Sequence, residues 1–95
     1  MLKELFAIIE ARKADPQPGS YTNYLLNEGE DKILKKIGEE AMEVILAAKG
    51  QGDQHLIEEV SDLFYHTLVL LAQQDVTLAE VEAELRRRHA ARKPA

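Results

Sequence analysis

Residues 35–43 read KKIGEEAME, and residues 58–62 read EEVSD. Carboxylates spaced three and four residues apart lie over one another on a helix, because each residue turns the helix by about 100°. Two such helices folded back on each other would bring four or five acidic groups to one place. Like charges at short distance repel, so this place needs a compensating charge. A divalent cation with oxygen ligands is the simplest candidate, and Mg²⁺ beside a phosphate substrate is a common use of one.

The two motifs lie on two long predicted helices, one over about 30–49 and one over about 53–74. Each helix has an apolar stripe that is expected to face the core. On the first helix the stripe contains Ile33, Ile37, Ala41, Val44 and Ala48, widened by Leu34 and Ile45. On the second helix it contains Leu56, Val60, Leu63, Phe64, Thr67 and Leu71. Both sets of acidic residues fall at the rim of these stripes, where partial burial is possible.

Shorter helices are predicted on either side of this pair, and no pattern calls for a strand. They span residues 2–14, 21–26 and 78–91, and residues 15–19 contain two prolines that end the first of them. The run 68–72 is apolar on nearly all sides, which indicates cover by a second copy of the chain as well as by its own. We therefore predict a single all-α domain over residues 1–95, a four-to-five-helix antiparallel bundle that dimerises, with residues 92–95 as a flexible tail.

The amino-acid composition excludes several kinds of site and binding partner. The chain has no cysteine, which excludes disulfides, zinc–thiolate sites and a thiol nucleophile, and its net charge of −5 argues against nucleic acid as a partner. The first residues do not resemble a signal peptide, and charges interrupt every apolar run, so a cytoplasmic protein without a membrane partner is expected. The basic residues 86–88 near the end of the sequence are read as solvated surface, with contact to a substrate phosphate as the alternative.

Several readings compete for the acidic residues. A single pair of glutamates is usually solvated surface, but two clusters beside two core stripes favour a site. The spacing of a calcium-binding loop is missing, and a small helical bundle offers no sugar cleft for a glycosidase. Gly38 is costly inside a helix, so close approach of a ligand or of a neighbouring helix is expected there. His55, His66 and His89 are each read as rim or surface residues.

The spacing of the acidic residues resembles the EExxE and ExxD signature of the all-α nucleoside triphosphate pyrophosphohydrolases, the MazG-like superfamily. The matching residues are Glu39, Glu40, Glu43, Glu59 and Asp62. Within that superfamily, the chain is most similar to the phosphoribosyl-ATP pyrophosphohydrolases of histidine biosynthesis. The segments that carry this closer resemblance are SYT at 20–22, KKIGEEA at 35–41, EVSDL at 59–63 and the Tyr65-His66 pair, with the ending around Arg87 and Arg88.

The resemblance implies a reaction and a set of roles. The reaction is the Mg²⁺-dependent cleavage of the α–β phosphoanhydride of phosphoribosyl-ATP to phosphoribosyl-AMP and pyrophosphate, by a homodimer with sites near the subunit interface. Glu40, Glu43, Glu59 and Asp62 would be metal ligands, and Glu39 and Glu43 would act in catalysis, Glu39 as a ligand or as the group that orients the water. Lys36, Lys35, Ser20 and Thr22 would contact the substrate. A phosphoribosyl-AMP cyclohydrolase on a separate chain would be the neighbour in the pathway.

Two other functions remain open at this stage. A house-cleaning pyrophosphohydrolase of the MazG-like type, acting on non-standard or deoxynucleoside triphosphates, would share the metal chemistry and differ in its base and sugar pocket. A helical dimerisation module without activity would explain the apolar run 68–72 but would bind no Mg²⁺.

Overall fold

The computed structural model describes residues 1–92, which form five α-helices and no strand. The helices are α1 (Leu2–Ala14), α2 (Tyr21–Glu28), α3 (Glu30–Gly50), α4 (Asp53–Gln73) and α5 (Leu78–Arg92). The prediction of an all-α protein is confirmed, and each predicted helix is present. No helix within residues 1–92 has an apolar stretch long enough to cross a membrane.

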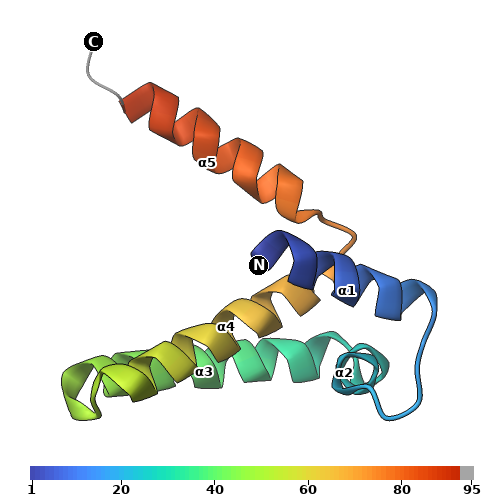
Figure 1. Ribbon diagram of the computed structural model, residues 1–95, viewed down its shortest axis with the longest axis horizontal. Coiled ribbons are helices and arrows are strands. Elements are labelled where there is room, and N and C mark those ends of the chain that lie inside the picture. Colours follow the sequence, from blue (N-terminus) through green and yellow to red (C-terminus); the bar gives the residue numbers. More distant parts are fainter. Residues whose placement is uncertain (93–95) are drawn as a thin grey trace.

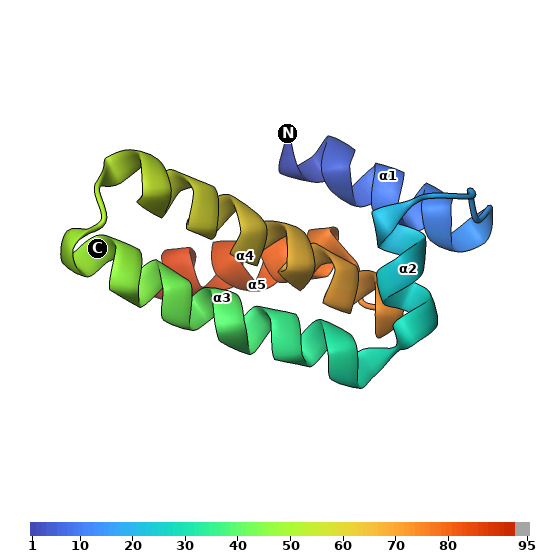
Figure 2. The ribbon, with the colours of Figure 1, turned by 90° about the horizontal axis from the view of Figure 1, so that it is seen from below.

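The antiparallel pair of α3 and α4 forms the long axis of the molecule (Figures 1 and 2). The connection between them is short because Gly52 adopts a positive φ of 91°, a conformation that suits glycine and lets the chain reverse at once. The helices α1 and α2 pack at the other end of the pair, near the start of α3 and the end of α4. An antiparallel pairing of this kind places the middle of α3 opposite the middle of α4, which is where both acidic motifs lie.

The hydrophobic core is concentrated at the end of the molecule where α1 and α2 cover the long pair. Its fully buried side chains include Ile9 from α1, Leu25 from α2, Ile33 from α3 and Val69 from α4. Burial of a large aliphatic side chain contributes about 1.5–3 kcal/mol, so this four-helix contact is the main source of stability in the single chain. The acidic motifs lie next to this core on α3 and α4, on the side toward the Gly50–Gly52 connection.

The predicted core faces of the two long helices are partly wrong. On α3, Leu34 and Ile45 are 43% and 57% exposed, whereas Ala47 is buried. On α4, Phe64 is 48% exposed, and the buried positions instead include His66 and Val69. The second half of α4 is apolar nearly all round, so its sequence does not tell which side faces α3. The rest of the chain packs on the side of His66 and Val69 and leaves the side of Phe64 open.

The last helix, α5, projects away from the other four (Figure 1). Within the described range Leu78–Arg92 none of its residues is buried, and Leu78 in its first turn packs against the core. Arg87 and Arg88 pair with Glu84, and Arg86 with Glu82, all on α5 itself, which favours the surface reading of these cations. Helix α5 includes Arg92, and the other residues of the predicted tail lie outside the described residues.

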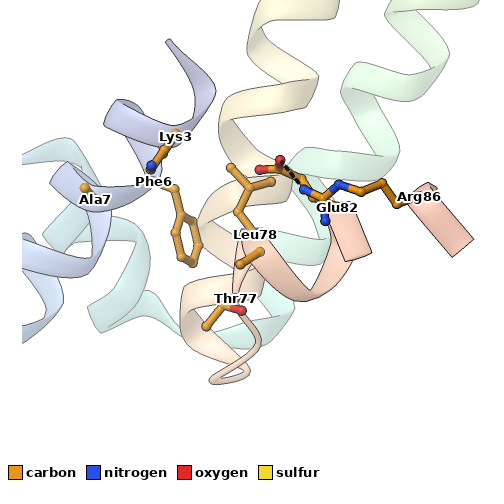
Figure 3. Close-up of a pocket in the computed structure, with 8 residues that line it drawn as sticks. Lys3, Phe6, Ala7, Thr77, Leu78, Glu82 and Arg86 are labelled. Atoms are coloured by element: carbon orange, nitrogen blue, oxygen red, sulfur yellow. Dashed lines mark ion pairs between the residues drawn. The ribbon is translucent and has the colours of Figure 1, made fainter. Parts of the chain in front are cut away.

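A hollow of about 420 Å³ lies where the first turns of α5 pass α1 (Figure 3). Lys3 and Phe6 line it from α1, and Leu78, Glu82 and Arg86 line it from α5. Glu82 and Arg86 are 3.7 Å apart and neutralise each other. The hollow belongs to the junction of α5 with the bundle and contains none of the acidic residues of the two motifs, so the chemistry lies elsewhere.

Candidate metal centre

The antiparallel pairing of α3 and α4 brings acidic side chains of both motifs together. Glu43 on α3 and Glu59 on α4 approach closely, and His55, one turn before Glu59, joins them. One ligand atom from each of these three residues lies within 4.8 Å of the others, and all three side chains are partly buried. Two carboxylates and an imidazole at this spacing can hold one cation.

A second group lies one turn further along the same two helices. Here the Nδ1 atom of His66 lies 2.6 Å from the Oε1 atom of Glu40, and the same nitrogen is 2.9 Å from the backbone oxygen of Asp62. The Nε2 atom of His66 is 3.0 Å from the hydroxyl of Tyr21, which reaches over from α2. His66 is 5% exposed, so this group is almost closed to solvent on the histidine side.

The environment of Glu40 disfavours its ionised form. Burial raises the pKa of this carboxyl group above its ordinary value, and the negative charge of Asp62 raises it further, although His66 and Lys36 act in the opposite direction. The Oε1 atom is buried and has no aligned hydrogen bond, even though Nδ1 of His66 is within 2.6 Å. The same Nδ1 atom is also 2.9 Å from the backbone oxygen of Asp62, so Glu40 and Asp62 share a single ring nitrogen. Glu40 is thus a buried carboxylate whose charge the protein alone compensates incompletely.

These observations fit a hard divalent cation. Carboxylates accept and do not donate hydrogen bonds, and oxygen ligands of this type are those that Mg²⁺ prefers. The incompletely compensated charge of the Glu40 carboxylate and the convergence of Glu43 with Glu59 are what a cation would satisfy. Asp62 is exposed and close enough to Glu40 to affect its pKa, so it stands at the open side of the same region.

The other predicted site residues of α3 differ in their placement. Lys36 is partly buried, one turn before Glu40, and its charge acts on that carboxyl group. Lys35 and Glu39 are exposed, on the solvent side of α3. A Cβ added at Gly38 would meet no atom within 4 Å among the described residues, so no neighbouring helix of the same chain requires this glycine. Of the two reasons predicted for Gly38, contact with a neighbouring helix of this chain is wrong.

The predicted substrate-binding residues Ser20 and Thr22 both make hydrogen bonds within the protein. The Oγ atom of Ser20 caps α2 by accepting a hydrogen bond of 3.1 Å from the backbone N–H of Asn23. Thr22 is buried, and its hydroxyl bonds to the hydroxyl of Tyr65 on α4. Neither hydroxyl reaches the carboxylates, whereas Tyr21 between them reaches His66.

Three residues near the centre were not among the predicted site residues, and one of them, His66, was interpreted as a rim residue but is buried. His55 has a visible signal, because it precedes Glu59 by four residues and therefore lies over it on the helix, with 3.7 Å between Nε2 and the Glu59 carboxylate. Tyr21 has no such signal, because its contact with His66 joins positions 45 residues apart in the sequence. Only the packing of α2 against α4 creates that contact.

An all-α bundle with carboxylates of two antiparallel helices turned toward one site has the architecture expected of the all-α pyrophosphohydrolases. Residues 2–89 match the family described as phosphoribosyl-ATP pyrophosphohydrolase. The chain therefore belongs to the phosphoribosyl-ATP pyrophosphohydrolase family and is an enzyme, which sets aside the reading as a dimerisation module without activity.

Several similar curated proteins are named phosphoribosyl-ATP pyrophosphatase. A phosphoribosyl-ATP pyrophosphatase of Listeria monocytogenes is 58% identical over 88 residues, which are 93% of this chain and 84% of the relative. The corresponding protein of Bacillus cytotoxicus is 52% identical over 88 residues, 93% of this chain and 82% of the relative. That of Lactiplantibacillus plantarum is 52% identical over 87 residues, 92% of this chain and 82% of the relative.

Proposed function

We propose that this chain hydrolyses the α–β phosphoanhydride of phosphoribosyl-ATP to phosphoribosyl-AMP and pyrophosphate, the second step of histidine biosynthesis, and that it requires Mg²⁺. The observation that carries the proposal is the meeting of Glu43 and Glu59 from two helices, in a chain whose residues 2–89 match this family. Water is the only co-reactant, since its hydrogen and hydroxyl are divided between the two products. Phosphoribosyl-AMP would then pass to a phosphoribosyl-AMP cyclohydrolase.

The proposed ligands are Glu40, Glu43, Glu59 and Asp62. Mg²⁺ bound to them would neutralise phosphate charge and lower the pKa of a bound water. The chain's own residues do the rest: Lys36, beside Glu40, contacts a phosphate oxygen and offsets the acidic charge that would repel the substrate. Glu39 and Lys35 are exposed on α3. In this proposal Glu39 orients the water and Lys35 adds a phosphate contact.

The enzyme is further proposed to act as a homodimer. Ile57 and Phe64 on α4 and Leu85 on α5 are 57%, 48% and 59% exposed, and an apolar groove of about 400 Å³ runs between these two helices. Large apolar side chains exposed together along a groove are typical of a subunit interface. A second copy of the chain would cover it and would hold α5, which the single chain hardly contacts.

The test is release of pyrophosphate from phosphoribosyl-ATP by the purified protein, with and without Mg²⁺. Glu59→Gln should lower kcat/KM by about 100-fold or more, because a charge-neutralising ligand is lost. Glu58→Gln is the matched control, since it is the adjacent glutamate with its side chain 57% exposed against 16% for Glu59. Turnover without a divalent cation, or equal loss in both variants, would contradict the proposal.

A substrate panel tests the house-cleaning alternative. The same protein should prefer phosphoribosyl-ATP over deoxynucleoside and modified nucleoside triphosphates at equal concentration. A higher kcat/KM for any of these triphosphates would transfer the proposal to a house-cleaning enzyme with the same metal ligands.

A further inference from the structure

His66 is the most buried ionisable side chain near the candidate metal centre, and neither the motif nor the proposed reaction gives it a role. It joins three helices: it lies on α4, its Nδ1 atom faces Glu40 on α3, and its Nε2 atom faces Tyr21 on α2. The residues SYT at 20–22 lie close to it, and the hydroxyls of Ser20 and Thr22 make hydrogen bonds within the protein.

The neighbours of His66 determine which nitrogen carries the proton. Nδ1 faces the carbonyl oxygen of Asp62 and the carboxylate of Glu40, and both of these are acceptors only. Nδ1 must therefore be protonated. The hydroxyl of Tyr21, 3.0 Å from Nε2, can then donate to the unprotonated nitrogen. The acceptors at Nδ1 set the tautomer, and the Tyr21 hydroxyl stabilises it by pairing with the lone pair of Nε2.

The ring plane of His66 is fixed as well. Tyr21 and Tyr65 both contact it edge to face, at 5.8 Å and 5.1 Å between ring centroids and interplanar angles of 90° and 83°. Tyr65 is itself held by the hydroxyl of Thr22 on α2. Two residues of α2 therefore hold the Tyr65–His66 pair of α4 in one orientation.

We propose that Tyr21 and His66 are positioning residues that set the orientation of the Glu40 carboxylate for the cation. The Nδ1–H of His66 attracts Oε1 of Glu40 and keeps it in place, which leaves the second carboxylate oxygen for the cation. Without the Tyr21 hydroxyl, the buried Nε2 atom loses its hydrogen-bond partner, and the ring is no longer held with its Nδ1–H toward the carboxylate. The inference rests on the proposed metal site and adds to it a role for α2.

The test measures binding of Mn²⁺, as a spectroscopic substitute for Mg²⁺, to the metal-free protein by electron paramagnetic resonance and calorimetry. Tyr21→Phe removes only the hydroxyl that faces Nε2 and should weaken Mn²⁺ binding by about tenfold, the lower end of the range for residues that orient metal ligands. Tyr24→Phe is the matched control, because Tyr24 lies on the same helix with 45% exposure against 46% for Tyr21, and stacks on Tyr21 without bonding to His66. It should bind Mn²⁺ as the wild type does.

Two further measurements separate positioning from a general structural effect. In pyrophosphate release, Tyr21→Phe should need about tenfold more Mg²⁺ for half-maximal rate and should recover wild-type kcat at saturating Mg²⁺. In a His66→Asn background, where the partner of the hydroxyl is gone, Tyr21→Phe should cause no additional loss of Mn²⁺ affinity. If His66→Asn does not fold, the Tyr21→Phe and Tyr24→Phe pair still decides the question.

The outcomes distinguish this inference from the proposed function. If the wild type binds no Mn²⁺, the metal site itself is wrong. If the wild type binds Mn²⁺ and Tyr21→Phe binds it equally well, the metal site stands and the positioning role is wrong. Equal weakening by Tyr24→Phe would also overturn the positioning role, because it would assign the effect to the aromatic stack.

Discussion

The two sides of α4 differ in what the rest of the chain does with them. On one side, His66 is buried, and Glu59 and Asp62 lie near Glu43 and Glu40 of α3. On the other side, Phe64 and its apolar neighbours are open, and α5 continues that open surface away from the bundle. The first side of α4 therefore encloses a polar side chain, His66, whereas the second side leaves a large apolar side chain, Phe64, exposed.

The difference suggests a separate binding partner for each side of α4. Enclosing titratable groups is costly unless a partner compensates them, which supports the proposed cation on the first side. Exposing large apolar groups is also costly, which supports the proposed second subunit on the second side. The single chain is stable mainly through the core at the α1 and α2 end. The following predictions test each side separately.

The largest effect is expected on the open side. Phe64→Glu should convert a dimer to monomers, since losing an interface anchor costs about 2 kcal/mol or more for each copy and a symmetric pair loses two copies. The dissociation constant should rise by about a thousandfold, measured by sedimentation equilibrium. Ile8→Glu on α1, with the same 48% exposure but outside the groove, is the control and should leave the association unchanged. Association that survives Phe64→Glu would place the interface elsewhere.

On the enclosed side, Lys36→Met tests the proposed phosphate contact. Loss of a charge-assisted hydrogen bond costs about 1.5–3 kcal/mol, so kcat/KM for phosphoribosyl-ATP should fall by about 10–100-fold. Lys32→Met is the control, because Lys32 is also partly buried on α3 but lies 5.7 Å from the ring centroid of Tyr24 instead of beside Glu40. Steady-state kinetics of both variants decide the point, and equal losses would remove Lys36 from the site.

Glu40→Gln should separate stability from metal binding. Burial and the charge of Asp62 raise the pKa of Glu40, so its ionised form destabilises the metal-free fold and a neutral amide should stabilise it. We expect a gain of about 1 kcal/mol in the free energy of unfolding without metal, together with weaker Mn²⁺ binding. Thermal unfolding with and without Mn²⁺ measures both. A variant that is less stable without metal would show that the His66 contact outweighs the cost of burial.

The sequence predicted the parts of this molecule that depend on local spacing. The breaks at Asp15–Gly19 and Gly50–Gly52 and the grouping of Glu40, Glu43, Glu59 and Asp62 on helix rims follow from turn chemistry and the helical period. Which side of α4 is buried does not follow from spacing, because its second half is apolar nearly all round. The contact of Tyr21 with His66 also could not be predicted, because it depends on how α2 packs across 45 positions of sequence.

The smallest effect is expected at the start of α5, the helix with least support from the chain. The Glu80 carboxylate accepts hydrogen bonds from the backbone N–H and the hydroxyl of Thr77, at 2.9 Å and 3.0 Å, and these bonds lower its pKa. A lowered pKa in the folded state means that the cap contributes above the ordinary value near 4.5 and is lost as the pH falls through the lower folded value. Amide exchange in the first turn of α5 should therefore increase, relative to its intrinsic rate, only at acid pH.

The control is Glu80→Gln, which keeps an acceptor that does not titrate, so amide exchange in this variant should lose the pH dependence. Because α5 packs so little on the bundle, the global unfolding midpoint should change in neither case, and a shift in that midpoint would show that α5 is coupled to the core.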